Sequence, residues 1–143
     1  MDEIRAAYGL LNLKQVDSAI ANRKFIAEKY RKALKNVPGI RMLKDIEGVH
    51  HNYAYFPIFI DESVYGISRD SLYEKLKEHN IYGRRYFYPL ISTFSAYKGL
   101  ESASPANLPV AHKLANQVLC LPMFADLDDE GINRVINVVV NRK

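Results

Sequence analysis

Apolar residues recur at helical spacing through the first quarter of the chain. Between residues 2 and 36 they return every three or four positions: Ala6, Leu10, Leu13, Val16, Ile20, Ala27, Tyr30 and Leu34. No proline interrupts this stretch, and Asn36-Val37-Pro38-Gly39 is a stop signal. The pattern predicts one long helix over residues 2–36. Because such a helix is longer than a small core can cover, we expect it to bend near Gly9 or Asp17-Ser18, or to pack one end on a further protein surface.

Strand patterns and a second helix come next. Residues 40–44 predict a short strand, and residues 52–60 predict another with Ala54, Phe56, Ile58 and Ile60 on its core face. Pro57 has no backbone N–H and therefore indicates an edge position or a bulge. Ser68 is placed as a helix N-cap with Asp70 in the first turn. The apolar stripe of that helix is Leu72, Tyr73 and Leu76, and the helix should end near His79-Asn80.

The densest group of aromatic residues lies in residues 81–90, which we predict to be a strand ended by Pro89. Strict alternation would place Ile81, Arg85 and Phe87 on one face and Tyr82, Arg84, Tyr86 and Tyr88 on the other. The second face combines apolar rings with hydroxyl and guanidinium groups, which suits contact with a polar ligand. A half-exposed strand with Tyr and Arg on its solvent side explains the same pattern without any ligand.

The remaining residues predict a loop, a helix, a strand and a last helix. Residues 91–104 should form a long surface loop, and a helix should follow from about Leu108 with Pro109 in its first turn. Residues 118–121 predict a buried strand closed by Pro122. The last helix should start at Asp126, bury Ile132, Val135, Ile136 and Val139, and end with Arg142 and Lys143. The order of elements predicts an α+β fold: a small, mainly antiparallel or mixed sheet with helices on one side, and residues 1–143 as a single domain.

Composition narrows the class of protein. Of the 143 residues 48% are hydrophobic and 25% are charged, as in soluble globular domains. The net charge of +4 comes from scattered basic residues, which argues against nucleic-acid or membrane partners. The one cysteine, Cys120, lies in an apolar run and is predicted to be a buried thiol. A chain without disulfides that opens Met1-Asp2-Glu3 is typical of an intracellular protein, and we expect a cytoplasmic one.

No self-contained catalytic set is visible. His50 and His51 are adjacent, without further ligands at metal spacing, and favour a surface turn. His79 suits a helix end, and His112 has no identifiable partner. The acidic run Asp126, Asp128, Asp129 and Glu130 is explained by a solvated helix start. We therefore expect no catalytic residue and no metal site within this chain.

Four motifs in order carry a resemblance to a known family. They are Met1–Leu13, the pattern Arg-x-x-Ile-Ala-x-x-Tyr from Arg23 to Tyr30, the run Arg84-Arg85-Tyr86-Phe87-Tyr88-Pro89-Leu90, and Leu119-Cys120-Leu121-Pro122. Together they resemble the C-terminal part of the DegT/DnrJ/EryC1/StrS family. Its members are pyridoxal-phosphate (PLP) dependent aminotransferases that act mostly on nucleotide-linked keto-sugars. The resemblance covers nearly the whole chain.

The resemblance implies that this chain is the small domain of a larger enzyme. In the family, the Schiff-base lysine, the aspartate on the pyridine nitrogen and most phosphate ligands belong to a larger N-terminal domain, so this chain alone should hold no PLP and be inactive. The parent would be a homodimer that transfers an amino group from an amino acid, with glutamate expected, to a nucleotide-linked keto-sugar. Arg84, Arg85, Tyr86 and Tyr88 become the candidates for lining its substrate cleft.

One departure and one alternative remain. Many relatives carry histidine immediately before Tyr-Pro, near the sugar, whereas this chain has Phe87; a subset of relatives has the same Arg-Arg-Tyr-Phe-Tyr-Pro run. The role of position 87 therefore does not carry over. The alternative function is a free-standing α+β module that stacks single-stranded RNA bases, or binds another anionic ligand, on a sheet displaying Tyr, Phe and Arg.

Overall fold

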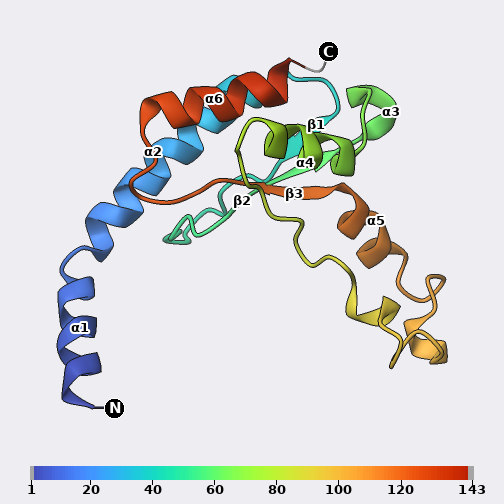
Figure 1. The fold of residues 1–143 in the computed structure, drawn as a ribbon, viewed down its shortest axis with the longest axis horizontal. Helices are drawn as coiled ribbons and strands as arrows, with labels where there is room; N and C mark the ends of the chain where they lie inside the picture. The colour runs from blue at the N-terminus through green and yellow to red at the C-terminus, as the bar shows by residue number, and fades with distance from the viewer. Residues whose placement is uncertain (1, 142–143) are drawn as a thin grey trace.

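A three-stranded antiparallel sheet with helices on one face forms the body of the protein (Figure 1). The computed structural model describes residues 2–141. Along the chain lie α1 (Glu3–Leu13), α2 (Val16–Leu34), β1 (Ile40–Met42), β2 (Phe56–Ile60), α3 (Glu62–Tyr65), α4 (Arg69–Glu78), the 3-10 turns η1 (Ile91–Thr93) and η2 (Glu101–Ala103), α5 (Pro109–Gln117), β3 (Val118–Leu121) and α6 (Asp129–Val140). The strand order is β1-β2-β3. The predicted α+β class is confirmed.

The hydrophobic core fills the space between the sheet and helices α2, α4 and α6, which lie together on one side (Figure 1). Alternate residues of β2 and β3 supply the sheet's part of this core: Phe56, Ile58, Ile60, Leu119 and Leu121. The helices cover them with fully buried side chains, among them Ile26, Tyr30, Leu34, Leu72, Leu76, Ile132 and Val139. The predicted apolar stripes of α2, α4 and α6 are therefore core stripes, except that Val16 at the start of α2 is exposed. Ala54, predicted on the core face of the second strand, is exposed and precedes β2.

Pro57 lies in the central strand, at a point where the strand has a partner on one side only. It is paired with Cys120 of β3, while β1 ends at Met42, which pairs with Ile58. The backbone N–H and C=O groups of Cys120 both form hydrogen bonds with Arg84, so the pair of Cys120 with Pro57 carries no hydrogen bond. The missing N–H of Pro57 thus faces the side where β1 has ended, and the predicted edge position holds locally.

The first predicted helix is two helices. α1 ends at Leu13 and α2 begins at Val16, so the predicted single helix over residues 2–36 is wrong at Lys14-Gln15. There the N–H groups of Lys14 and Gln15 donate three residues back, to Leu11 and Asn12, and Ser18 Oγ donates to the Gln15 carbonyl. This tight turn lies close to Asp17-Ser18, one of the two positions at which a bend was expected. No core packing holds α1 in line with α2, because α1 buries no residue.

Several other predicted boundaries agree closely with the structure, although the strand predicted over residues 52–60 begins only at Phe56. Ser68 Oγ accepts from the Ser71 N–H as the N-cap of α4, and α5 begins at Pro109. α6 begins at Asp129 rather than Asp126, because Asp128 is the N-cap and accepts from the Gly131 N–H. The roles predicted for Arg142 and Lys143 lie outside the described residues. Among residues 2–141, no helix is both long and apolar enough to cross a membrane.

Two arms project from the body, on the side away from α6: helix α1 and the segment 90–108 (Figure 1). Both display large apolar side chains to solvent, including Ile4, Tyr8, Leu10, Leu11 and Leu13 on α1 and Ile91, Phe94, Tyr97 and Leu100 on the second arm. Surfaces of this kind mark interaction sites in soluble proteins.

We expect the isolated chain to self-associate through α1 as its concentration rises, because Leu10 is 64% and Leu13 66% exposed. Light scattering over a concentration series measures this. Leu10→Glu should shift the chain toward monomer, since it places a charge within the apolar surface. A wild-type chain that stays monomeric at every concentration would contradict the expectation, as would an assembly unchanged in Leu10→Glu.

Candidate functional site

Residues 82–88 do not form the predicted strand. Within this segment the structure shows a single bridge, in which Arg84 and Cys120 exchange both backbone hydrogen bonds, at 2.9 and 2.8 Å. The next pair of such a ladder would join Tyr86 to Val118. Both polar groups of Val118 are already used, because its N–H donates to Leu114 and its carbonyl accepts from Arg69. The segment therefore leaves the sheet after Arg84 and turns, and the Tyr88–Pro89 peptide is cis.

Gly83 allows the bridge to form. A Cβ at this position would lie 3.1 Å from the Cys120 carbonyl oxygen and 3.2 Å from the Leu119 side chain. The backbone thus approaches β3 more closely than a side chain would comfortably allow. This contact fixes where Arg84 leaves the sheet, and so where its side chain starts.

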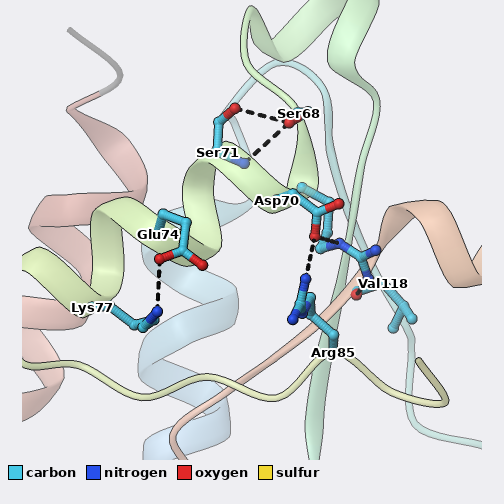
Figure 2. Close-up of polar contacts among 8 residues, drawn as sticks. Ser68, Asp70, Ser71, Glu74, Lys77, Arg85 and Val118 are labelled. Atoms are coloured by element: carbon cyan, nitrogen blue, oxygen red, sulfur yellow. Dashed lines mark hydrogen bonds and ion pairs between the residues drawn. The ribbon is translucent and has the colours of Figure 1, made fainter. Parts of the chain in front are cut away.

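An arginine–aspartate cluster holds the turn that follows. The Asp70 carboxylate, in the first turn of α4, forms an ion pair with Arg69 Nε at 2.9 Å and accepts a hydrogen bond from Arg85 Nη1 at 3.0 Å. Arg85 reaches Asp70 from the neighbouring segment (Figure 2). Arg69 also donates to the Val118 carbonyl at 3.1 Å. The Arg69 side chain is 1% exposed. Asp70 thus ties the start of α4 to the segment that follows the bridge.

Aromatic rings complete this cluster. The guanidinium carbon of Arg85 lies 4.4 Å from the centre of the Tyr88 ring and 4.5 Å from that of Tyr73. Arg69 lies 4.9 Å from the centre of the same Tyr88 ring. Cation–π contacts of this geometry stabilise both partners. Arg85 and Tyr88 are therefore committed to holding the chain in place, which leaves them less available to a ligand.

Acid should weaken the cluster. Partial burial disfavours the ionised carboxylate, but the Arg85 hydrogen bond and the Arg69 charge outweigh it and lower the pKa of Asp70 below its usual range. A carboxyl group with a lowered pKa stabilises the fold above its unfolded value of about 3.9, and this stabilisation is lost as the pH falls through the folded pKa. We expect urea denaturation to show a steeper loss of stability below about pH 4 in the wild type than in Asp70→Asn. Identical pH profiles for the two proteins would contradict this.

Arg84 is placed differently from Arg85. It lines a cavity of about 370 Å³ together with Tyr55, Tyr82, Cys120 and Phe124. Arg84 is exposed, and within residues 2–141 its guanidinium has no ion-pair partner. A free guanidinium presents several donors in a planar fork that suits phosphate or carboxylate groups. We call this hollow, with the five residues named here, the Arg84 cavity.

The thiol in the Arg84 cavity is not reactive. Burial raises the pKa of Cys120 to about 11, although the nearby Arg84 charge acts in the opposite direction. A thiol with a raised pKa remains protonated at neutral pH and is a poor nucleophile. The prediction of a buried Cys120 is confirmed, with the side chain 4% exposed. Polar recognition in the cavity therefore comes from Arg84 and the tyrosines.

Tyr86 lies beside the Arg84 cavity, because its ring packs against Tyr55, which lines the cavity. The two rings are 5.0 Å apart between centres, and the neighbouring Tyr55 side chain raises the pKa of Tyr86. Phe87 packs on Tyr86 at 4.2 Å between ring centres. The strict alternation predicted for this segment is therefore wrong, because neighbouring residues share a side of the chain and Tyr88 lies with Arg85.

The structure thus divides the four predicted residues into two groups: Arg84 and Tyr86 at the cavity, Arg85 and Tyr88 in the Asp70 cluster. Sequence reasoning missed Tyr55 and Phe124 as cavity residues, and Arg69 as a buried cation. The sequence holds one signal for Arg69: an arginine beside the first-turn Asp70. For Tyr55 and Phe124 it holds none, because they follow from how the chain folds.

The comparisons with known proteins agree with this architecture. The family model of the DegT/DnrJ/EryC1/StrS aminotransferase family matches residues 1–140. The chain belongs to this family. A dTDP-4-amino-4,6-dideoxy-D-glucose transaminase from Escherichia coli is 45% identical over 142 residues, which cover 99% of this chain and 38% of that protein.

Solved structures share the fold of this chain. DesI, solved in the presence of its TDP-sugar product, is 32% identical with a TM-score of 0.87, covering 97% of this chain and 35% of that one. A Streptococcus pneumoniae protein solved in a PLP form shares the fold, with a TM-score of 0.85, 23% identity and coverage of 99% and 36%. This chain spans less than two fifths of the length of these relatives.

The residues described here do not fit a PLP site. A Schiff-base lysine must be held in a protected position over the cofactor ring. None of the described lysines is buried, and several are engaged elsewhere: Lys29 with Asp129, Lys77 with Glu74 and Lys75 with the Asn141 carbonyl. Nor do residues 2–141 contain a group of three or more side chains arranged to bind a metal.

The RNA-binding alternative loses its structural basis in this segment. It required a strand that displays Tyr, Phe and Arg side by side on one face of the sheet. Residues 82–88 contribute one bridge and then turn, and Arg85 is taken up by Asp70. The stacking surface that single-stranded RNA needs is therefore not formed here.

Proposed function

We propose that residues 1–143 are the small domain of a PLP-dependent aminotransferase that transfers an amino group to a nucleotide-linked keto-sugar. The observation that carries the proposal is an unpaired Arg84 on an aromatic-lined cavity, in a chain of the DegT/DnrJ/EryC1/StrS family. The rest of the protein would supply the PLP site. Glutamate would be the amino donor, and the enzyme would be a cytoplasmic homodimer.

Support for the substrate class comes from the relatives. The Escherichia coli relative is a transaminase of a dTDP-linked 4-amino sugar, and DesI was solved with a TDP-sugar product. Removal of the amino nitrogen from such a sugar leaves the 4-keto form, which is the acceptor we assign to the parent enzyme. A nucleoside diphosphate offers the anionic oxygens that an arginine fork binds.

Within this proposal the four candidate residues have different tasks. Arg84 binds an anionic group of the nucleotide-sugar, and Tyr86 with Tyr55 forms one wall of the path to it. Arg85 and Tyr88 hold the turn that carries Tyr86, through Asp70. The cofactor, bound elsewhere, would supply the electron sink, while this chain binds and orients the substrate.

The two arms would be interaction surfaces in the parent enzyme. Helix α1 and the segment 90–108 would pack on the larger domain or on the second subunit, which would remove their exposed apolar side chains from water. The cleft for the substrate would then lie between this domain and those surfaces.

The proposal predicts that the isolated chain is folded and catalytically silent. Added PLP should give at most slow, nonspecific imine formation, because exposed amines remain protonated and are poor nucleophiles. An absorbance scan with stoichiometric PLP, followed by borohydride reduction and peptide mapping, measures this. The longer protein serves as the positive control, with one labelled lysine outside residues 1–143.

A contrary result is easily recognised. One lysine of this chain labelled stoichiometrically, together with a visible band that shifts when glutamate is added, would show that residues 1–143 hold the cofactor themselves. The small-domain proposal would then be wrong.

A further inference from the structure

A basic hollow of about 290 Å³ lies between helices α4 and α6, apart from the Arg84 cavity. Its polar lining is Lys75, His79, Arg134, Asn137 and Asn141, and Ile81 contributes to its apolar base. We call it the α4–α6 hollow. It contains two permanent cations, an imidazole and two amides. None of the described residues that line it is acidic, and the nearby Glu78 and Glu130 are exposed and lie outside the lining.

The two cations are held in place by the backbone of the opposite helix. Lys75 Nζ donates to the Asn141 carbonyl, at the end of α6, at 2.6 Å, and Arg134 Nη2 donates to the His79 carbonyl, at the end of α4, at 2.9 Å. Carbonyl groups at helix C-termini need such partners. Because both cations are already held by hydrogen bonds to these carbonyl groups, less side-chain entropy is lost when an anion binds.

Arg134 retains donors for a ligand. A guanidinium has five N–H groups, and only the bond to His79 is formed within the described part of the chain. Asn137 adds a side-chain amide that makes no hydrogen bond to another described residue, and amide N–H₂ groups bind phosphate oxygens well. The hollow therefore offers several donors around one space without a competing carboxylate in its lining.

An apolar groove continues from the α4–α6 hollow. A second hollow of about 250 Å³ shares Ile81 and Arg134 with it and extends along Tyr82, Phe124 and Leu127. Tyr82 is 68% and Phe124 52% exposed, so both rings are open to a ligand. Aromatic rings of this kind stack on planar groups. A ligand with a phosphate at one end and an aromatic ring at the other matches the two hollows together.

We infer that the α4–α6 hollow binds a phosphate group, either free or as a phosphomonoester whose aromatic part lies on Tyr82 and Phe124. The phosphate position goes beyond the proposed substrate cleft, because its charges come from Arg134 and Lys75 rather than from Arg84. Tyr82 and Phe124 line both the apolar groove and the Arg84 cavity. Two features carry the inference together: paired cations fixed by helix ends, and a lining without acidic residues in the described chain.

The test is a titration of the 143-residue chain with inorganic phosphate and, separately, with thymidine 5′-monophosphate, followed by calorimetry and by amide NMR shifts. Sodium chloride of equal ionic strength is the reference. We expect saturable binding with shifts centred on His79, Arg134 and Asn137. Tighter binding of the monophosphate than of inorganic phosphate assigns the site to a phosphomonoester, and equal binding assigns it to free phosphate.

Two variants and two controls make the test specific. Arg134→Met should weaken binding about tenfold or more, the loss expected for a hydrogen bond to a charged group. Asn137→Asp adds a negative charge inside the hollow without removing a backbone contact, and should weaken binding similarly. Asn116→Asp, on the exposed surface of α5, adds the same charge elsewhere and should bind like the wild type. Arg41→Met removes a cation that lines neither hollow and should also leave binding unchanged.

Three results would overturn the inference. The first is the absence of any saturable change beyond that caused by sodium chloride. The second is binding that survives in both folded variants, Arg134→Met and Asn137→Asp. The third is binding lost in Arg84→Met alone, which would place the anion in the Arg84 cavity and support the proposed function instead.

Discussion

Replacement of Arg69 by methionine should lower the free energy of unfolding by about 2 kcal/mol, because the variant leaves the buried Val118 carbonyl without its hydrogen-bond donor and removes the ion pair with the half-exposed Asp70. The Arg69 side chain is 1% exposed and joins the Val118 carbonyl to Asp70, beside the Tyr88 ring. Methionine keeps most of the apolar stem, so the loss reports on the guanidinium. Urea denaturation monitored by circular dichroism gives the value.

Arg84→Met is the matched control for this experiment. Arg84 is exposed and has no ion-pair partner among the described residues, so its removal should change stability by less than about 0.5 kcal/mol. Equal losses in the two variants would mean that the structure assigns the wrong arginine to the fold. A stable Arg69→Met variant would equally contradict the role of the Asp70 cluster.

In the full-length aminotransferase that we propose, Arg84→Met should lower kcat/KM for the nucleotide-linked keto-sugar about 10- to 150-fold, the range expected for a hydrogen bond to a charged group. The loss should be mainly in KM, because the proposal assigns Arg84 to substrate binding and not to the chemistry. The half-reaction with the amino donor should be unaffected. Steady-state kinetics with each substrate varied in turn separates these effects.

Arg41→Met is the control for the kinetic experiment. Arg41 stacks on Phe59 at 4.0 Å and does not line the Arg84 cavity, so its removal should leave kcat/KM close to the wild-type value. Unchanged kinetics in the Arg84→Met enzyme would show that the Arg84 cavity does not bind the substrate. Impaired reaction with the amino donor alone would assign Arg84 to the donor's carboxylate instead of the diphosphate.

Much of the fold could be predicted because its signals are local. The stripes of α4 and α6 follow helical spacing, Ser68 is a strong N-cap residue, and residues 118–121 form a short apolar run bounded by Pro122. Each of these depends on neighbours along the chain. The break at Lys14-Gln15 was harder to place, since α1 has no core contact that would mark where the pattern changes.

The candidate site was predicted only in part because its geometry depends on distant contacts. Residues 82–88 have the composition of a strand, but Arg69 and Leu114 occupy the backbone groups of Val118 that a longer ladder would need. Pairing partners of this kind are separated by tens of residues and leave no periodic signal. Arg84 and Arg85 lie in different sites for the same reason, because the chain leaves the sheet and turns after Arg84.

The most direct test of the small-domain assignment is the transfer of nitrogen-15 from labelled glutamate to the 4-keto form of the dTDP-linked sugar by the longer protein with PLP. We predict a labelled dTDP-linked 4-amino sugar with the complete enzyme, and none with residues 1–143 alone. Mass spectrometry of the purified sugar nucleotide measures the label. Label transferred by residues 1–143 alone, or no label transferred from any amino donor to any nucleotide-linked keto-sugar by the complete protein, would contradict the assignment.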